Sequence, residues 1–126
     1  MKLLLDTHVV LWQLSGAARI GPGAVHAIGE ADEVAMSVVS FAEIGVKAAI
    51  GKLEVPEDLE AQIRALDVRV LPLEAHQALA VGGLPIHHRD PFDRLLIAQA
   101  LAERMTLVSA DRRFADYGAS LIDAGV

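Results

Sequence analysis

The chain has 126 residues, 53% of them hydrophobic and 22% charged, which excludes a disordered chain and predicts one domain over residues 1–126. Its apolar runs are far shorter than the ~20 residues of a membrane helix and its start lacks a signal-peptide core, so we expect a cytoplasmic protein without membrane contact. The net charge of −6 opposes a broad electrostatic contact with nucleic acid, and the absence of cysteine means that any metal must be bound by oxygen or imidazole.

Short apolar segments rich in β-branched residues alternate with longer segments of helical spacing. Strands are predicted at residues 2–5, 36–39, 68–71 and 106–109, with helices at 56–66 and 90–101 among the segments between them. Asp90 and Pro91 form a helix start, and the residues after them are apolar on nearly every face, which predicts a buried central helix. The alternation predicts an α/β fold, a mostly parallel sheet with helices on both faces.

Four acids follow the predicted strands or open the helices after them. Asp6 ends the first strand, Glu43 is expected in the first turn of the helix after the second strand, Asp93 opens the buried helix, and Asp111 follows residues 106–109. In a doubly wound sheet such positions meet at the carboxyl ends of the strands. Gathered carboxylates repel one another unless a cation neutralises them, and Mg²⁺ or Mn²⁺ prefers oxygen ligands. The sequence therefore predicts a metal site suited to phosphodiester hydrolysis.

Each acid also has a purely structural interpretation. Ser40 and Glu43 fit a helix capping box, and Asp90, Asp93 and Asp111 could each stabilise a helix start. Asp6 fits a purely structural interpretation least well, because a charge at the end of a buried strand requires a partner or a metal. The common edge of the sheet is what favours a shared site.

Other polar and aromatic residues give weaker indications. Several arginines lie close in sequence to the acids and could form a local positive surface, with Arg94 and Arg112 the candidates for substrate contact: Arg89, Arg94, Arg112 and Arg113. Ordinary surface arginines fit the pattern equally well. The sequence gives His8 a structural position and Trp12 a core or interface position, and His87 and His88 a loop from which they could approach a substrate.

Together the segments LLLDTHVVLWQL, SVVSFAEIGVKAAIGKL, HHRDPFDRLLIAQAL and LVSADRRFADYG resemble the PIN-domain ribonucleases of the VapC toxin type. The resemblance covers nearly the whole chain in order, and DPFDRLLIAQA combined with LLLDTH and LVSAD is its specific part. It implies a PIN-like three-layer α/β/α sandwich, Mg²⁺- or Mn²⁺-dependent endonucleolytic cleavage of RNA, a homodimer, and neutralisation by a cognate VapB-type antitoxin of a type II toxin–antitoxin system.

By motif position, the resemblance assigns metal binding and catalysis to the four acids named above. Asp90 and Ser109 match auxiliary residues of the family motifs. The family also suggests that an antitoxin arginine can enter the acidic site, which agrees with the fork geometry of guanidinium–carboxylate pairs.

Three other functions remain open at this point. A receiver-type phosphoacceptor domain has a similar length, sheet and Mg²⁺-binding acids, but Asp6 is followed by Thr7 and His8 instead of a paired acid, and no lysine ends a late strand. A haloacid-dehalogenase-like phosphatase would have a second aspartate where His8 stands. A PIN-like binding module without activity would not need the complete set of acids, and the fold alone would not separate these proteins.

Overall fold

The computed structural model describes residues 1–16, 19–86 and 90–126, and its centre is a five-stranded parallel sheet with the order β3-β2-β1-β4-β5. The strands are β1 (Lys2–Leu5), β2 (Glu33–Ser37), β3 (Arg69–Leu71), β4 (Thr106–Ser109) and β5 (Leu121–Asp123). In the register of the central strand, Leu4 lies opposite Ala35 of β2 and Leu107 of β4. The predicted α/β fold with a mostly parallel sheet is confirmed.

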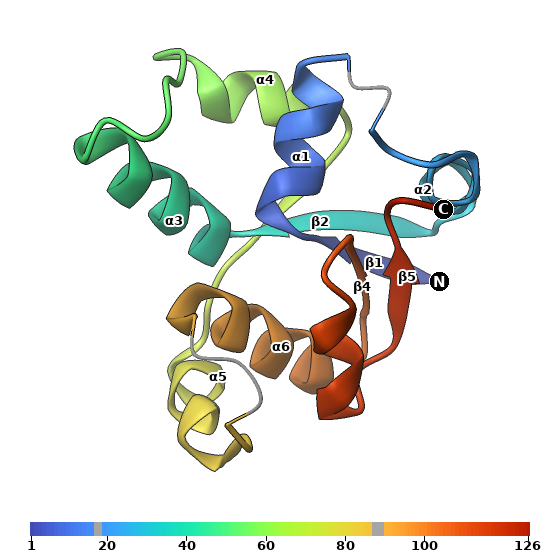
Figure 1. Ribbon diagram of the computed structural model, residues 1–126, viewed down its shortest axis with the longest axis vertical. Coiled ribbons are helices and arrows are strands. Elements are labelled where there is room, and N and C mark those ends of the chain that lie inside the picture. The colour runs from blue at the N-terminus through green and yellow to red at the C-terminus, as the bar shows by residue number, and fades with distance from the viewer. Residues whose placement is uncertain (17–18, 87–89) are drawn as a thin grey trace.

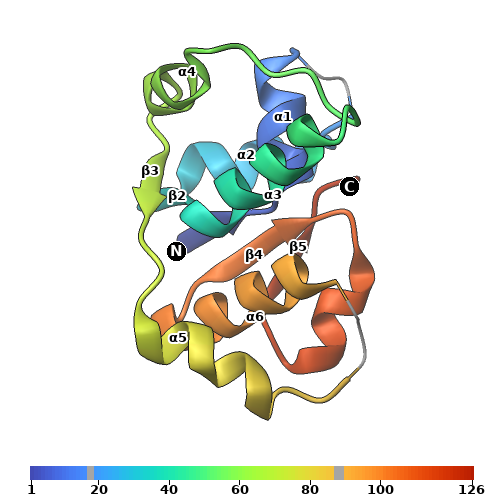
Figure 2. The same ribbon diagram turned by 90° about the vertical axis from the view of Figure 1, so that its left-hand side faces the viewer.

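Helices cover both faces of this sheet, which gives the α/β/α arrangement of three layers. Their bounds are α1 (Thr7–Leu14), α2 (Pro22–Glu30), α3 (Val38–Ala49), α4 (Leu59–Ala65), α5 (Ala75–Ala80) and α6 (Pro91–Glu103), with short 3-10 helices η1 (Val81–Gly83) and η2 (Arg112–Tyr117). Figure 2 shows α1, α2 and α4 on one side of the sheet and α5 and α6 on the other. None of the helices in the described ranges is long and apolar enough to cross a membrane.

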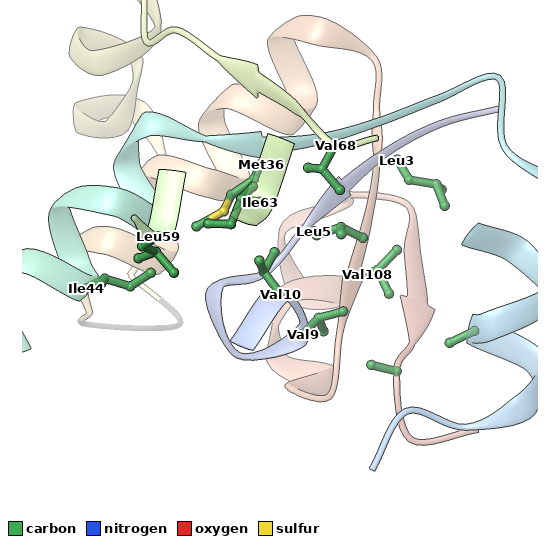
Figure 3. Close-up of a cluster of buried hydrophobic side chains, with 12 residues drawn as sticks. Leu3, Leu5, Val9, Val10, Met36, Ile44, Leu59, Ile63, Val68 and Val108 are labelled. Carbon is green, nitrogen blue, oxygen red and sulfur yellow. The ribbon is translucent and has the colours of Figure 1, made fainter. Parts of the chain in front are cut away.

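The leucines of β1 point alternately into the two helical layers. Leu3 and Leu5 belong to a core with Val9 and Val10 of α1 and Ile63 of α4, as Figure 3 shows. Leu4 instead packs in a second core, together with Leu96, Ile97, Leu107 and Phe114. Because both faces of the strand are buried, its sequence is continuously apolar instead of alternating.

The second strand ends earlier than the sequence predicts. β2 stops at Ser37, whose Oγ accepts a hydrogen bond of 3.0 Å from Val39 N and caps α3. Val38 and Val39 therefore begin a helix although β-branched residues favour strands, because the cap and the packing of Val39 outweigh that weak local preference. Glu43 consequently lies in the second turn of α3, and the prediction of the first turn is wrong.

The start of α6 agrees with the prediction. Asp90 Oδ1 accepts hydrogen bonds from Phe92 N at 2.9 Å and from Asp93 N at 3.3 Å, and Pro91 is the first helical residue. Residues 96–100 are all buried, as expected for a central helix. This cap fixes Asp93 in the first turn, at the carboxyl edge of the sheet.

Beyond the carboxyl end of β5, the start of α2 contacts the last residues of the chain. Gly21 N donates to Ala124 O at 2.7 Å and Ala24 N donates to Val126 O at 3.1 Å. A Cβ atom at Gly21 would lie 2.2–2.6 Å from backbone atoms of Val126. Only glycine permits this close approach of two backbones.

Candidate active site

The strand order reverses at β1, which places a crevice at the carboxyl ends of β1 and β4. Asp6 directly follows β1 and Asp111 lies just beyond β4. The helices α3 and α6 begin at the same edge, as the course of the chain in Figure 1 shows, and they supply Glu43 and Asp93. Residues that are remote in sequence thus come together through the topology of the sheet.

A cavity of about 440 Å³ lies at this edge, and we call it the acid cavity. It is lined by Asp6, His8, Trp12, Glu43, Lys47, Asp90, Asp93, Ala110, Asp111 and Arg113. The structure therefore brings together all four acids selected from the sequence, with Asp90 as a fifth. A larger cavity of about 510 Å³ opens elsewhere, between residues such as Gln13, Asp32 and Arg69, and holds none of these five.

Asp6 is buried at the base of the acid cavity, with 6% of its surface exposed. Its Oδ2 accepts a hydrogen bond of 2.8 Å from Ser109 Oγ, and Ser109 Oγ accepts one of 3.0 Å from Asp111 N. Burial raises the pKa of the Asp6 carboxyl and the Ser109 bond opposes that rise. Ser109 lines no part of the cavity itself but links Asp6 of one strand end to Asp111 of the next.

Glu43 is also buried, and both of its oxygens have partners. Thr7 Oγ1 lies 2.8 Å from Glu43 Oε1 and 2.8 Å from Ser40 Oγ, so its single proton goes to the carboxylate while Ser40 donates to Thr7. Glu43 Oε2 accepts a bond of 2.8 Å from Lys47 Nζ, which raises the pKa of Lys47. The capping-box interpretation of Ser40 and Glu43 is wrong, since Ser37 caps α3 and Glu43 turns into the cavity.

The carboxyl of Asp93 has a pKa far above its usual value. Burial, followed by the charges of Asp90, Asp6, Glu43 and Asp111 in that order, raises the pKa of Asp93 to about 8. The carboxylates are therefore close enough to oppose each other's ionisation. Such a site favours the binding of a cation, because a positive charge removes the repulsion.

Asp111 both lines the cavity and caps η2. Its Oδ1 accepts from Arg113 N and from Arg113 Nε at 3.0 Å each, and its Oδ2 accepts from an Arg113 terminal nitrogen at 2.8 Å. This forked pair raises the pKa of the Arg113 guanidinium. The structural interpretation of Asp111 as a cap is thus correct, and it does not exclude a place in the site.

The donor set fits a hard divalent cation in its chemistry. The cavity offers carboxylate oxygens from five acids, and burial together with the neighbouring carboxylates raises the pKa of Asp93. Within the described residues, no three acidic or histidine side chains lie close enough together to hold one metal ion in their present positions. Binding an ion would require the side chains to converge, with Lys47 and Arg113 giving up their present carboxylate partners.

Two arginines expected beside the acids lie elsewhere. The Arg94 guanidinium donates to the carbonyl oxygens of Val81, Leu84 and Pro85 at 2.9–3.3 Å, and so stabilises the turn around η1. Arg112 Nε donates to Asp123 Oδ2 at 2.9 Å at the end of β5. Neither residue lines the acid cavity, and their contact with a substrate stays a prediction. The other residues expected near the acids or the substrate, His87, His88 and Arg89, lie outside the described residues.

Three further residues line the cavity: His8, which was expected in a structural position, Trp12, which was expected in the core or an interface, and Lys47, for which no role was predicted. His8 and Trp12 come from successive turns of α1, with ring centroids 6.3 Å apart, and Lys47 comes from α3. The signal that could have found them is helical spacing, since Lys47 is four residues after Glu43 and Trp12 is four after His8.

Comparison with known proteins identifies the family. The PIN domain family matches residues 3–120. Ribonuclease VapC22 of Mycobacterium tuberculosis is 32% identical over 123 residues, which cover 91% of this chain and 91% of that protein.

Solved structures have the same fold. VapBC-5 from Mycobacterium tuberculosis superposes with a TM-score of 0.60 at 25% identity, covering 100% of both chains. VapBC2 from Rickettsia felis, bound to a DNA fragment from its promoter, has a TM-score of 0.69 over 97% of this chain and 98% of that chain, and at 17% identity it shows the fold alone. The family match covers nearly the whole chain, and the VapC relative aligns with nine tenths of it. This chain therefore belongs to the PIN-domain family and is of the VapC type.

Proposed function

We propose that this protein is the toxin of a type II toxin–antitoxin system, an endoribonuclease that depends on Mg²⁺ or Mn²⁺. The observation that carries the proposal is the acid cavity, which five carboxylates line and in which burial and the neighbouring charges raise the pKa of Asp93 to about 8. The similarity to Ribonuclease VapC22 supports RNA as the substrate. Residues 1–126 would act as a single PIN domain.

In this proposal Asp6, Glu43, Asp93 and Asp111 hold the metal. A bound divalent ion supplies a polarised phosphoryl oxygen and a water of lowered pKa, which is the chemistry that phosphodiester hydrolysis requires. Ser109 orients Asp6 through its bond of 2.8 Å, and Thr7 orients Glu43. Asp90 acts through the α6 cap that positions Asp93.

The basic side chains that pair with the acids would contact the substrate. Lys47 and Arg113 line the acid cavity while paired with Glu43 and Asp111. With a metal held by these carboxylates, Lys47 and Arg113 would lie beside the site and would contact the phosphate oxygens of RNA. A chain with a net charge of −6 depends on such local cations, because its overall field repels a polyanion.

A VapB-type antitoxin is the partner that we propose for this chain. The similar structures include the toxin–antitoxin complexes of VapBC-5 and VapBC2. An arginine from the antitoxin would fit the acid cavity, since a guanidinium pairs with carboxylates through two parallel hydrogen bonds. We further propose that the toxin itself forms a homodimer.

Incubation of the purified protein with a mixed RNA pool, followed by mapping of new ends, tests the proposed activity. We expect cleavage with Mg²⁺ or Mn²⁺, its loss in EDTA, and a loss of at least ~100-fold in Asp93→Asn, because removal of one charged metal ligand lowers both affinity and rate. Asp116→Asn is the matched control, since Asp116 is exposed on η2 and lies outside the acid cavity. Full-length RNA after incubation with folded wild-type protein would contradict the proposal and favour a silent binding module.

A further inference from the structure

A second cavity, which we call the side cavity, opens next to the acid cavity. It has a volume of about 280 Å³ and is lined by Thr7, His8, Leu11, Lys47, Lys52 and Leu53. His8 and Lys47 line both cavities, so the two are neighbours on one surface. The side cavity is built by α1, the end of α3 and the segment that follows α3, which lie on the same side of the molecule in Figure 1.

Lys52 gives the side cavity a cation without an acidic partner. The side chain is exposed, and within the described residues no ion pair or side-chain hydrogen bond involves it. By contrast, the two cations of the acid cavity, Lys47 and Arg113, are paired with Glu43 and Asp111. A bond of 2.9 Å from Lys52 N to Lys47 O holds the segment against the end of α3.

The other wall of the side cavity is apolar. Leu11 and Leu53 are partly buried and pack against the core that lies under α1. An apolar wall beside an unpaired ammonium suits a ligand with one flat apolar part and one anionic part. A nucleotide has both parts, and its neighbour in the same strand would lie at the acid cavity next to it.

We infer that the side cavity binds the nucleotide next to the scissile phosphodiester of single-stranded RNA, with Lys52 pairing with its phosphate and Leu11 and Leu53 contacting its base. The inference rests on the proposed ribonuclease function. It requires an unpaired base, because in a duplex the base faces its partner strand and cannot enter a pocket. The site thus selects exposed loops and single strands over paired RNA.

Binding and cleavage of a short oligoribonucleotide test the inference with the full chain. Fluorescence anisotropy in EDTA measures Kd without cleavage, and kinetics with Mn²⁺ measure KM and kcat. We expect Lys52→Ala to weaken binding about 3- to 10-fold, to raise KM with little change in kcat, and to lower the slope of log Kd against log salt by about 0.7, the value for one lost phosphate contact on a single strand. Lys52→Arg should restore binding, because it keeps the charge.

Two controls decide the outcome. Lys2→Ala removes an exposed lysine at the start of β1, at the opposite end of that strand from Asp6, and should bind like the wild type. An abasic oligomer of equal length and charge should bind several-fold more weakly than RNA. If Lys52→Ala behaves like Lys2→Ala, or if the abasic oligomer binds as tightly as RNA, the inference is overturned. Wild-type protein that neither binds nor cleaves RNA would instead overturn the proposed function.

Discussion

The charge of Asp93 opposes folding when no metal is present. Its pKa is raised from 3.8 to about 8, first by burial and then by the neighbouring acids. Between these two values the folded protein holds a proton that the unfolded chain releases, so stability falls as the pH rises through this range. The loss of stability is complete once the pH exceeds the folded-state pKa of about 8.

Replacement of Asp93 with asparagine should therefore stabilise the metal-free protein at high pH. Thermal melting in EDTA should give Asp93→Asn a higher Tm than the wild type at about pH 9, with the difference vanishing near pH 4, where both forms are neutral. Asp116→Asn is the control and should show no such trend. A difference in Tm that does not depend on pH would contradict the assigned cause. In saturating Mg²⁺ the wild type should instead have a higher Tm than Asp93→Asn, because the ion binds the folded wild type and stabilises it by mass action.

At the scale of single residues, the sequence predicted the acids better than their neighbours. Asp6 and Asp111 were found because each follows a short apolar strand, and strand ends converge in a parallel sheet. Arg94 lies outside the lining of the acid cavity, because proximity to Asp93 in sequence does not fix the direction of a long side chain on a helix. Lys52 carried no signal, because only the folding of the segment after α3 brings it beside α1.

At the scale of elements, the boundary between β2 and α3 depends on one hydroxyl. Ser37 is fully buried, and its Oγ accepts the Val39 N–H that would otherwise have no partner at the helix start. We expect Ser37→Ala to lower the free energy of unfolding by about 0.5–2 kcal/mol, as for other lost N-caps. Urea denaturation measures the change.

The matched control for this cap is Ser120→Ala, at an exposed serine whose side chain has no hydrogen bond in the described structure. It should change the free energy of unfolding by less than about 0.5 kcal/mol. Equal effects of the two substitutions would show that the Ser37 cap contributes nothing. Such boundaries are difficult to read from sequence, since Val38 and Val39 favour strands locally and the Ser37 cap together with the packing of Val39 decides their state.

Prediction at this scale also missed β5. Leu121–Asp123 is only three residues long and partly buried, so it carries too little pattern to separate it from a loop. The pairing of Val108 with Ile122 supplies the missing information, and it exists only after β4 is in place. The longer strands and α6 were predictable because burial on both faces leaves a continuous apolar run.

At the scale of the whole molecule, the approach of Gly21 to the last residues joins the start of α2 to the segment after β5. Gly21→Ala would place a methyl group within 2.2–2.6 Å of the Val126 backbone, so the two segments must separate. We expect a loss of about 1–3 kcal/mol in the free energy of unfolding, typical of overpacking. Chemical denaturation measures it.

A second glycine-to-alanine substitution in α2 is the control, and its expected effect on stability is the opposite. At Gly29, in the body of α2, an added Cβ meets nothing within 4 Å. Gly29→Ala should raise stability by about 0.5–1 kcal/mol, because alanine loses less backbone entropy in a helix. A gain at both positions would contradict the close contact at Gly21.

The bond between Ser109 Oγ and Asp6 Oδ2 joins residues that are 103 positions apart in the chain. Because β1 lies at the centre of the sheet, its pairing with β4 must wait until residues 106–109 have left the ribosome. During synthesis the nascent chain holds Asp6 and Glu43 but lacks Asp93 and Asp111, and so has no complete site. The four-acid site is thus incomplete until Asp111 has been synthesised and β4 has paired with β1.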